Sequence, residues 1–145
     1  MGVSVGRHAW PVIAPSLAQS IMKRYETSPS NPLDIILAEN IHSARQYVSS
    51  LLKTYLPGNF PLDTYVGLVE TSIGKMVPLQ DADDSLTLRA EPYNELIVNR
   101  EAFHGIPAVK GLSPVHPIEA YVDRKLFIHN LGHAVTAYLG YHKHP

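Results

Sequence analysis

The sequence has no cysteine, which excludes disulfide bonds and thiolate chemistry. That absence leaves the compartment open, and we expect a cytoplasmic protein. The chain also has no apolar run near the roughly 18 residues that a membrane-spanning helix needs, and no charged N-terminal segment leading into an apolar core. With 12 Lys and Arg against 13 Asp and Glu, the formal net charge is -1, and no basic run indicates a nucleic-acid partner. The composition is that of a globular chain without membrane or nucleic-acid partners.

Apolar stretches alternate with helical patterns in the first half of the 145 residues, a length that suits one domain. In order, the patterns predict a strand end, a helix, a strand, a helix and a strand, at residues 2–6, 14–25, 33–40, 42–56 and 63–71. Strands and helices that alternate with short connections are typical of an α/β fold with a mostly parallel sheet.

The second half has a different character. An acidic loop at residues 79–85 precedes two short apolar runs, 86–91 and 94–99, which we expect to form a hairpin or a small sheet. The acidic run at 81–84 has no ordered ligand spacing, so a solvated loop is expected there rather than a cation site. A connector rich in proline and glycine, residues 103–117, then leads to a long final helix.

Two glycines, Gly132 and Gly140, lie inside this final helix. Each costs about 1 kcal/mol relative to alanine, so their presence indicates that another backbone approaches closely. The chain starts and stops abruptly, and neither end reads as a domain completing itself. We therefore expect a fragment of a longer protein.

Polar side chains share one arc of the final helix, within "KLFIHNLGHAVTAYLG". With Lys125 at zero and about 100° per residue, His129 falls near 40°, His133 near 80° and Asn130 near 140°. Apolar residues occupy the opposite half of the helix. The arc differs from the Glu- and Lys-rich face of an ordinary solvated helix.

Three interpretations of this arc stay open. It is a solvated face, or His129 and His133 bind zinc at the i, i+4 spacing of a zinc hydrolase, although Asn130 stands where that motif has its glutamate. The third interpretation is proton transfer without metal, in which Lys125 acts as a base and the amide and imidazole bind the reacting oxygen. Oxidation of a secondary alcohol would need such groups.

The Lys-x4-Asn-x2-His spacing in this helix resembles the signature of the polyol-specific long-chain dehydrogenases/reductases, the mannitol dehydrogenase family. "NPLDIILAEN" resembles that family's strand before a Glu-Asn pair, "AEPYNELIVNRE" resembles the segment before its substrate domain, and "IAPSLAQSIMKR" resembles an earlier helix. The resemblance implies an NAD-dependent, metal-independent oxidation of a sugar alcohol or its phosphate, of the mannitol 1-phosphate to fructose 6-phosphate type. A hexuronate (tagaturonate or fructuronate) reductase of the same family and a catalytically silent interaction fragment stay as alternatives.

By this resemblance, Lys125 is the general acid/base, and Asn130 and His133 bind and polarise the reacting oxygen. His129 is a further substrate-binding candidate. Asn40 is expected to position the substrate or the lysine near the nicotinamide.

The resemblance also gives the cofactor side. Glu39, Asn40 and Gly6, which follow two of the expected strands, are the cofactor-binding candidates. The resemblance implies NAD, while the choice between NAD and NADP is left open because the residue that selects it is not identified in this sequence.

Two departures from the family pattern stand out. The family's "VDR" followed by an aliphatic residue and proline is here "SIGKMVP", so Gly74 replaces the aspartate and Lys75 the arginine. Lys75 is a candidate for attracting a substrate phosphate or carboxylate. The Gly-x-Gly-x-x-Gly turn that holds a dinucleotide's pyrophosphate is absent from the 145 residues. We expect residues 1–110 to be the C-terminal part of a dinucleotide-binding domain with a β extension, and 111–145 to begin a helical substrate domain. The isolated chain is expected to bind NAD weakly and to be inactive.

Overall fold

The computed structural model describes residues 1–77 and 87–143. Within these residues, five strands form one sheet in the order β1-β2-β3-β4-β5. The strands are β1 (Gly2–Val3), β2 (Leu33–Leu37), β3 (Val66–Ser72), β4 (Leu96–Asn99) and β5 (Leu112–Val115). The helical segments are α1 (Trp10–Thr27), α2 (Ala44–Lys53), α3 (Leu62–Tyr65), η1 (Arg100–Ala102), α4 (Ile118–Asp123), η2 (Arg124–His129) and α5 (Asn130–Lys143).

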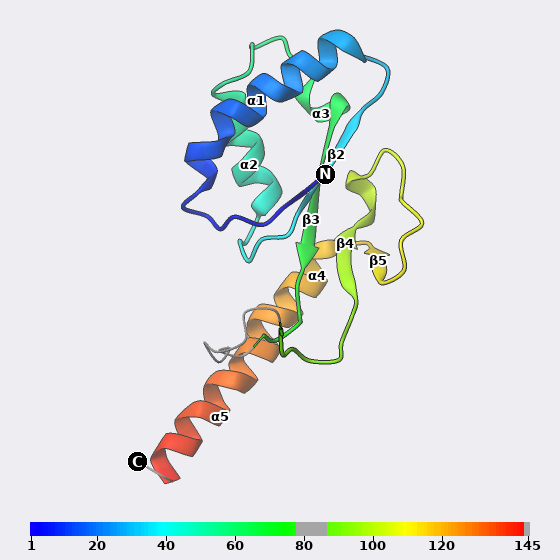
Figure 1. The fold of residues 1–145 in the computed structure, drawn as a ribbon. Helices are drawn as coiled ribbons and strands as arrows, with labels where there is room; N and C mark the ends of the chain where they lie inside the picture. The colour runs from blue at the N-terminus through cyan, green and yellow to red at the C-terminus, as the bar shows by residue number, and fades with distance from the viewer. Residues whose placement is uncertain (78–86, 144–145) are drawn as a thin grey trace.

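The first three strands run parallel, so their carboxyl ends meet at one edge of the sheet. All seven residues of β3 are buried, as expected for a central strand covered on both faces. Helices α1 and α2 lie on one side of these strands (Figure 1), and the main core forms between them and the sheet. The Rossmann-like α/β fold predicted from the sequence is confirmed.

Helix α1 begins one turn earlier than the sequence pattern predicts. Trp10, Ala14, Ala18 and Ile21 form its buried stripe, at the spacing of one helix face. Pro11 takes the first turn, where a missing N–H costs nothing, and Pro15 lies inside the helix instead of starting it.

The arrangement of the small extension corrects two expectations. Residues 87–91 form no strand, so the expected hairpin does not form in the part of it that the structure describes. Instead β4 pairs antiparallel with β3 and parallel with β5, and β5 lies inside the segment expected to be an irregular connector. Pro114 makes β5 hard to recognise from sequence, but a proline is tolerated in a strand that has a neighbour on one side only. The acidic run at 81–84 lies outside the described residues, and the domain division near residue 110 stays a prediction.

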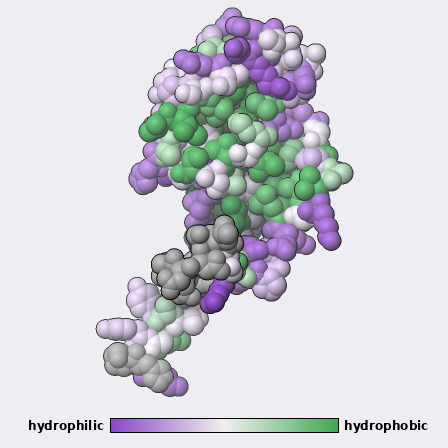
Figure 2. Space-filling view, in the orientation of Figure 1, coloured by the Kyte–Doolittle hydropathy of each residue, from purple (hydrophilic) through white to green (hydrophobic). Residues whose placement is uncertain are grey.

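The C-terminal segments α4, η2 and α5 follow one another and extend away from the sheet (Figures 1 and 2). Ile118 anchors α4 against the sheet, whereas α5 has no buried residue. A Cβ placed on Gly132 or Gly140 would meet nothing within 4 Å. The close approach expected at these glycines is therefore not made by any described part of this chain. No helix in residues 1–77 and 87–143 is long and apolar enough to cross a membrane.

Candidate functional site

The loops that follow β1 and β2 meet at the carboxyl edge of the parallel strands, where open α/β sheets bind their ligands. Gly6, after β1, has a φ of 78°, a backbone conformation that glycine adopts without strain. A Cβ at this position would meet nothing within 4 Å, so the backbone is open to a ligand. Asn40, after β2, is exposed at the same edge.

Glu39 holds these two loops together. Its carboxylate accepts hydrogen bonds from the backbone N–H of Val5 at 2.9 Å and of Gly6 at 3.1 Å, and from Trp10 Nε1 at 3.0 Å. Glu39 is 6% exposed, and its oxygens are occupied by these donors. The geometry gives Glu39 a structural task, the positioning of the Gly6 loop, and it stays a cofactor-binding prediction only in that indirect sense.

Lys125 and Asn40 are brought together from positions 85 residues apart. Lys125 Nζ donates a hydrogen bond to Asn40 Oδ1 at 2.9 Å. Burial lowers the pKa of the Lys125 amine from its ordinary value, because the charged form loses hydration. A lysine with a lowered pKa is better able to remove a proton near neutral pH.

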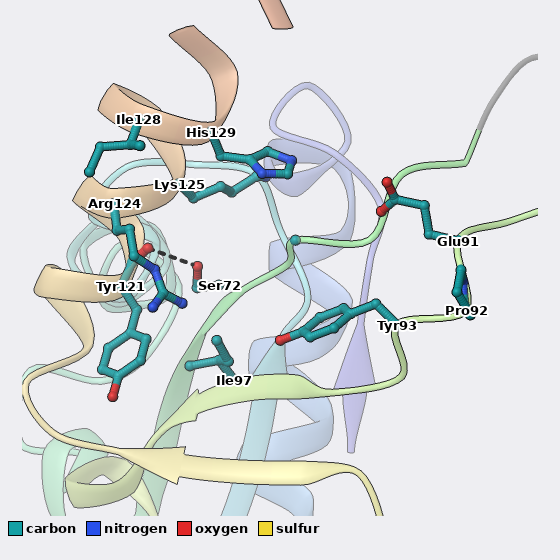
Figure 3. Close-up of a pocket in the computed structure, with 11 residues that line it drawn as sticks. Ser72, Glu91, Pro92, Tyr93, Ile97, Tyr121, Arg124, Lys125, Ile128 and His129 are labelled. Atoms are coloured by element: carbon teal, nitrogen blue, oxygen red, sulfur yellow. Dashed lines mark hydrogen bonds between the residues drawn. The ribbon is translucent and has the colours of Figure 1, made fainter. Parts of the chain in front are cut away.

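Two pockets flank this pair. The Tyr93 pocket, with a volume of about 610 Å³, lies on one side of the lysine (Figure 3). Its lining residues are Ser72, Gly74, Glu91, Pro92, Tyr93, Ile97, Tyr121, Arg124, Lys125, Ile128 and His129. The Gly6 pocket, of about 510 Å³, is lined by Ser4, Gly6, Arg7, Ala38, Glu39, Asn40, Ile41, His42, Ile73, Lys75 and Lys125. Lys125 lines both pockets, so its amine faces the place where two ligands would meet.

The segment that carries Lys125 is a π-helix, which the sequence does not indicate. Its i→i+5 hydrogen bonds turn each residue through less than the 100° of an α-helix. The angles predicted for the polar arc therefore do not hold between residues 124 and 129. Wide turns of this kind occur frequently at functional sites.

The predicted catalytic and substrate-binding residues are brought together only in part. Lys125 and His129 both line the Tyr93 pocket, as expected for groups that act on one substrate. Asn130 and His133 do not line either pocket described above. His133 is exposed and its ring lies against the ring of His129, with centroids 4.5 Å apart. The roles of Asn130 and His133 stay predictions.

The two departures from the family pattern lie in different pockets. Gly74 lines the Tyr93 pocket and adds no side chain to it. Lys75 lines the Gly6 pocket, and its amine donates to Asn94 Oδ1 at 2.7 Å. A metal site is not evident at the two histidines either, because the described residues contain no group of three His, Cys, Asp or Glu placed to hold an ion.

An ion pair that sequence reasoning missed joins β2 to the segment after η1. His104 Nδ1 lies 2.7 Å from Asp34 Oδ1, and His104 Nε2 lies 2.9 Å from the carbonyl oxygen of Thr64. Both ring nitrogens face oxygen acceptors, and the hydrogen bond to Asp34 is the main reason that the pKa of His104 is raised. A Cβ on Gly67 would collide with Asp34 and with the carbonyl of Ala102, so only glycine fits beside this pair.

Only the register of the sheet reveals this cluster. Asp34 and Gly67 are direct partners on β2 and β3, while His104 is 70 residues from Asp34 in the sequence. An aspartate inside an apolar strand was the one available signal, because a polar side chain in such a strand needs a partner.

The fold and the site together give the class of protein: a Rossmann-like domain in which the loops after two parallel strands meet a lysine that lies between two pockets. Comparison with known sequences identifies the family. Residues 2–111 match the model of the mannitol dehydrogenase Rossmann domain. The chain belongs to the mannitol dehydrogenase family.

Three bacterial relatives named mannitol-1-phosphate 5-dehydrogenase are similar over 97% of this chain. The protein from Geobacillus stearothermophilus is 35% identical over 143 residues, and that from Geobacillus thermodenitrificans is 34% identical over 143 residues. The protein from Bacillus velezensis is 34% identical over 147 residues. The chain spans 37 to 38% of the length of these relatives.

Proposed function

We propose that this chain supplies the proton-transfer lysine of an NAD-dependent polyol phosphate dehydrogenase, acting on a mannitol 1-phosphate type of substrate. The single observation that carries the proposal is the Lys125–Asn40 hydrogen bond at the carboxyl edge of the sheet, between two pockets. The family match and the relatives' printed name support the substrate class.

The Gly6 pocket suits the nicotinamide end of a dinucleotide. It lies at the carboxyl ends of β1 and β2, and the open backbone at Gly6 allows a flat ring to approach closely. Bound there, NAD would supply a hydride acceptor. Ser4, Gly6 and Asn40 are the residues that we expect to contact it.

The chain's own part in the reaction is the movement of one proton. The neutral amine of Lys125 takes the hydroxyl proton of the alcohol as the carbon gives up its hydride, and in the reverse direction the protonated amine returns it. Asn40 Oδ1 accepts one N–H of the amine, which fixes where the lone pair points. Burial lowers the amine's pKa, which raises the fraction of the basic form.

The test is the variant Lys125→Ala, made in the protein at the full length that its gene encodes. Loss of a general base costs about 10²–10⁴-fold in rate, so turnover of mannitol 1-phosphate with NAD should fall by that factor while the affinity for NADH, measured by its fluorescence, is kept. Lys23→Ala, an exposed lysine on α1 that lines neither pocket, is the matched control and should leave both unchanged. Unchanged turnover in Lys125→Ala would remove the proposed base.

A further inference from the structure

At the wall of the Tyr93 pocket, Arg124 is a cation that no acidic side chain among the described residues neutralises. Its guanidinium carbon lies 5.0 Å from the centroid of the Tyr121 ring, and this stacking directs the side chain along the pocket (Figure 3). Across the described part of the chain, no ion pair or hydrogen bond involves the guanidinium. An arginine that is positioned by an aromatic ring, but not neutralised, is prepared to bind an anion.

The other charges of the pocket leave this wall positive. Lys125 and His129 lie on the same helical segment as Arg124. Among the described residues that line the pocket, Glu91 alone is acidic. Glu91 lies on the opposite side of the pocket (Figure 3), where its carboxylate accepts a hydrogen bond from Met76 N at 2.9 Å. An oxyanion beside Arg124 would therefore meet a cationic surface.

The π-helix is what places these groups on one wall. In an α-helix, Arg124 and His129 would be about 140° apart, because five residues at about 100° each exceed one turn by that angle. The i→i+5 hydrogen bonding of η2 brings residues that are five apart in the sequence toward the same side of the helix. Arg124 and Lys125 are consecutive and line the same pocket, so one extended molecule can contact both.

We propose that Arg124 binds the phosphate of the substrate. The inference rests on the proposed function for its substrate class. A guanidinium matches phosphate oxygens through two parallel N–H donors, which a lysine amine cannot do. Lys75 is less suited to this task, since its amine is already held by Asn94 and it lines the other pocket.

The experiment is a titration of this chain followed by ¹⁵N NMR, since the chain contains Arg124 and the other described lining residues. The probes are inorganic phosphate, mannitol 1-phosphate and mannitol, and the readout is the Arg124 Nε–Hε resonance with the backbone amides around it. The two phosphates should shift these signals and mannitol should not. Arg124→Gln should weaken phosphate binding about tenfold or more, with the amide spectrum confirming that the variant is folded.

Matched variants make the result specific. Arg100→Gln removes another exposed arginine, one outside the pocket lining, and should leave phosphate affinity unchanged. Arg124→Lys keeps the charge but loses the planar fork and should bind with intermediate affinity. The phosphate assignment would be overturned by any of three results: unchanged affinity in Arg124→Gln, an equal response to mannitol, or no phosphate binding by the wild type.

The outcome is separable from that of the proposed function. Phosphate binding needs neither NAD nor turnover, so it can persist when Lys125→Ala leaves turnover unchanged, and the anion site would then stand without the dehydrogenase. Conversely, turnover could depend on Lys125 while the affinity for phosphate is the same with and without Arg124. That result would support the proposed reaction and refute the phosphate subsite.

Discussion

Replacing Glu39 by alanine should destabilise the protein and loosen the loop that lines the Gly6 pocket. The carboxylate accepts hydrogen bonds from N–H groups of Val5, Gly6 and Trp10. These residues lie on the loop after β1 and at the start of α1. The side chain of Trp10 is fully buried. The glutamate therefore connects the end of β2 to the end of β1.

The expected size follows from what each donor loses. A buried donor left unpaired costs about 1–3 kcal/mol, and this applies to Trp10 Nε1. Val5 and Gly6 are exposed and can bond water instead, so their loss is smaller. We expect Glu39→Ala to lower the free energy of unfolding by roughly 2–4 kcal/mol. Glu39→Gln keeps one accepting oxygen and should lose roughly half as much, about 1–2 kcal/mol.

The assay is urea unfolding followed by the fluorescence of Trp10, the only tryptophan, and by circular dichroism as an independent probe. Glu26→Ala, an exposed glutamate on α1, is the control and should change stability by less than about 0.5 kcal/mol. If Glu39→Ala is as stable as wild type but has lost affinity for NADH, the glutamate contacts the cofactor and the structural account is refuted.

Three further predictions follow from the sheet and the lysine. The pKa of His104 is raised in the folded protein, so its pairing with Asp34 contributes stability that is fully present below the unfolded pKa of 6.5. This stability is lost as pH rises through the folded pKa. Urea midpoints measured across pH should show the loss in wild type and not in His104→Gln. Gly67→Ala should lower the free energy of unfolding by about 1–3 kcal/mol, because the new Cβ collides with Asp34 and with a carbonyl of η1. Gly58 has open space around it, so Gly58→Ala should lower this free energy much less in the same urea assay. Because the pKa of Lys125 is lowered, kcat/KM for alcohol oxidation should rise with pH and level off below the lysine's ordinary pKa of 10.5. The kcat/KM for ketone reduction should fall over the same range. A pH profile that is unchanged in Lys125→Ala would contradict this prediction.

Local patterns predicted the parallel part of the sheet, because buried strands and amphipathic helices leave periodic apolar signals. They failed where tertiary contacts decided the outcome. Strand β5 contains Pro114 and forms only because β4 offers it a parallel neighbour. Residues 87–91, which have a strand-like composition, form no strand. Strand propensity depends on the neighbour that a segment finds, and sequence does not show that neighbour.

Sequence brought together two residues of the candidate site but not the geometry around them. The family resemblance selected Lys125 and Asn40 together, and the structure joins them by a hydrogen bond. It did not indicate that the Glu39 carboxylate accepts hydrogen bonds from the Gly6 loop, or that a π-helix carries the lysine. Both depend on hydrogen bonds between segments or across a widened turn, for which the residue types alone give no signal.

The split within the predicted catalytic set has a physical cause. Lys125 lies where the C-terminal helical segments still contact the strand ends, so Asn40 fixes its amine and burial lowers its pKa. Asn130 and His133 lie beyond that contact, on α5, which has no buried residue. A side chain on an exposed helix samples several rotamers, and only a neighbour that restricts them can hold it against a substrate oxygen. The position of the Lys125 amine and its lowered pKa are therefore set within this chain. The roles predicted for Asn130 and His133 need a neighbour that restricts their side chains.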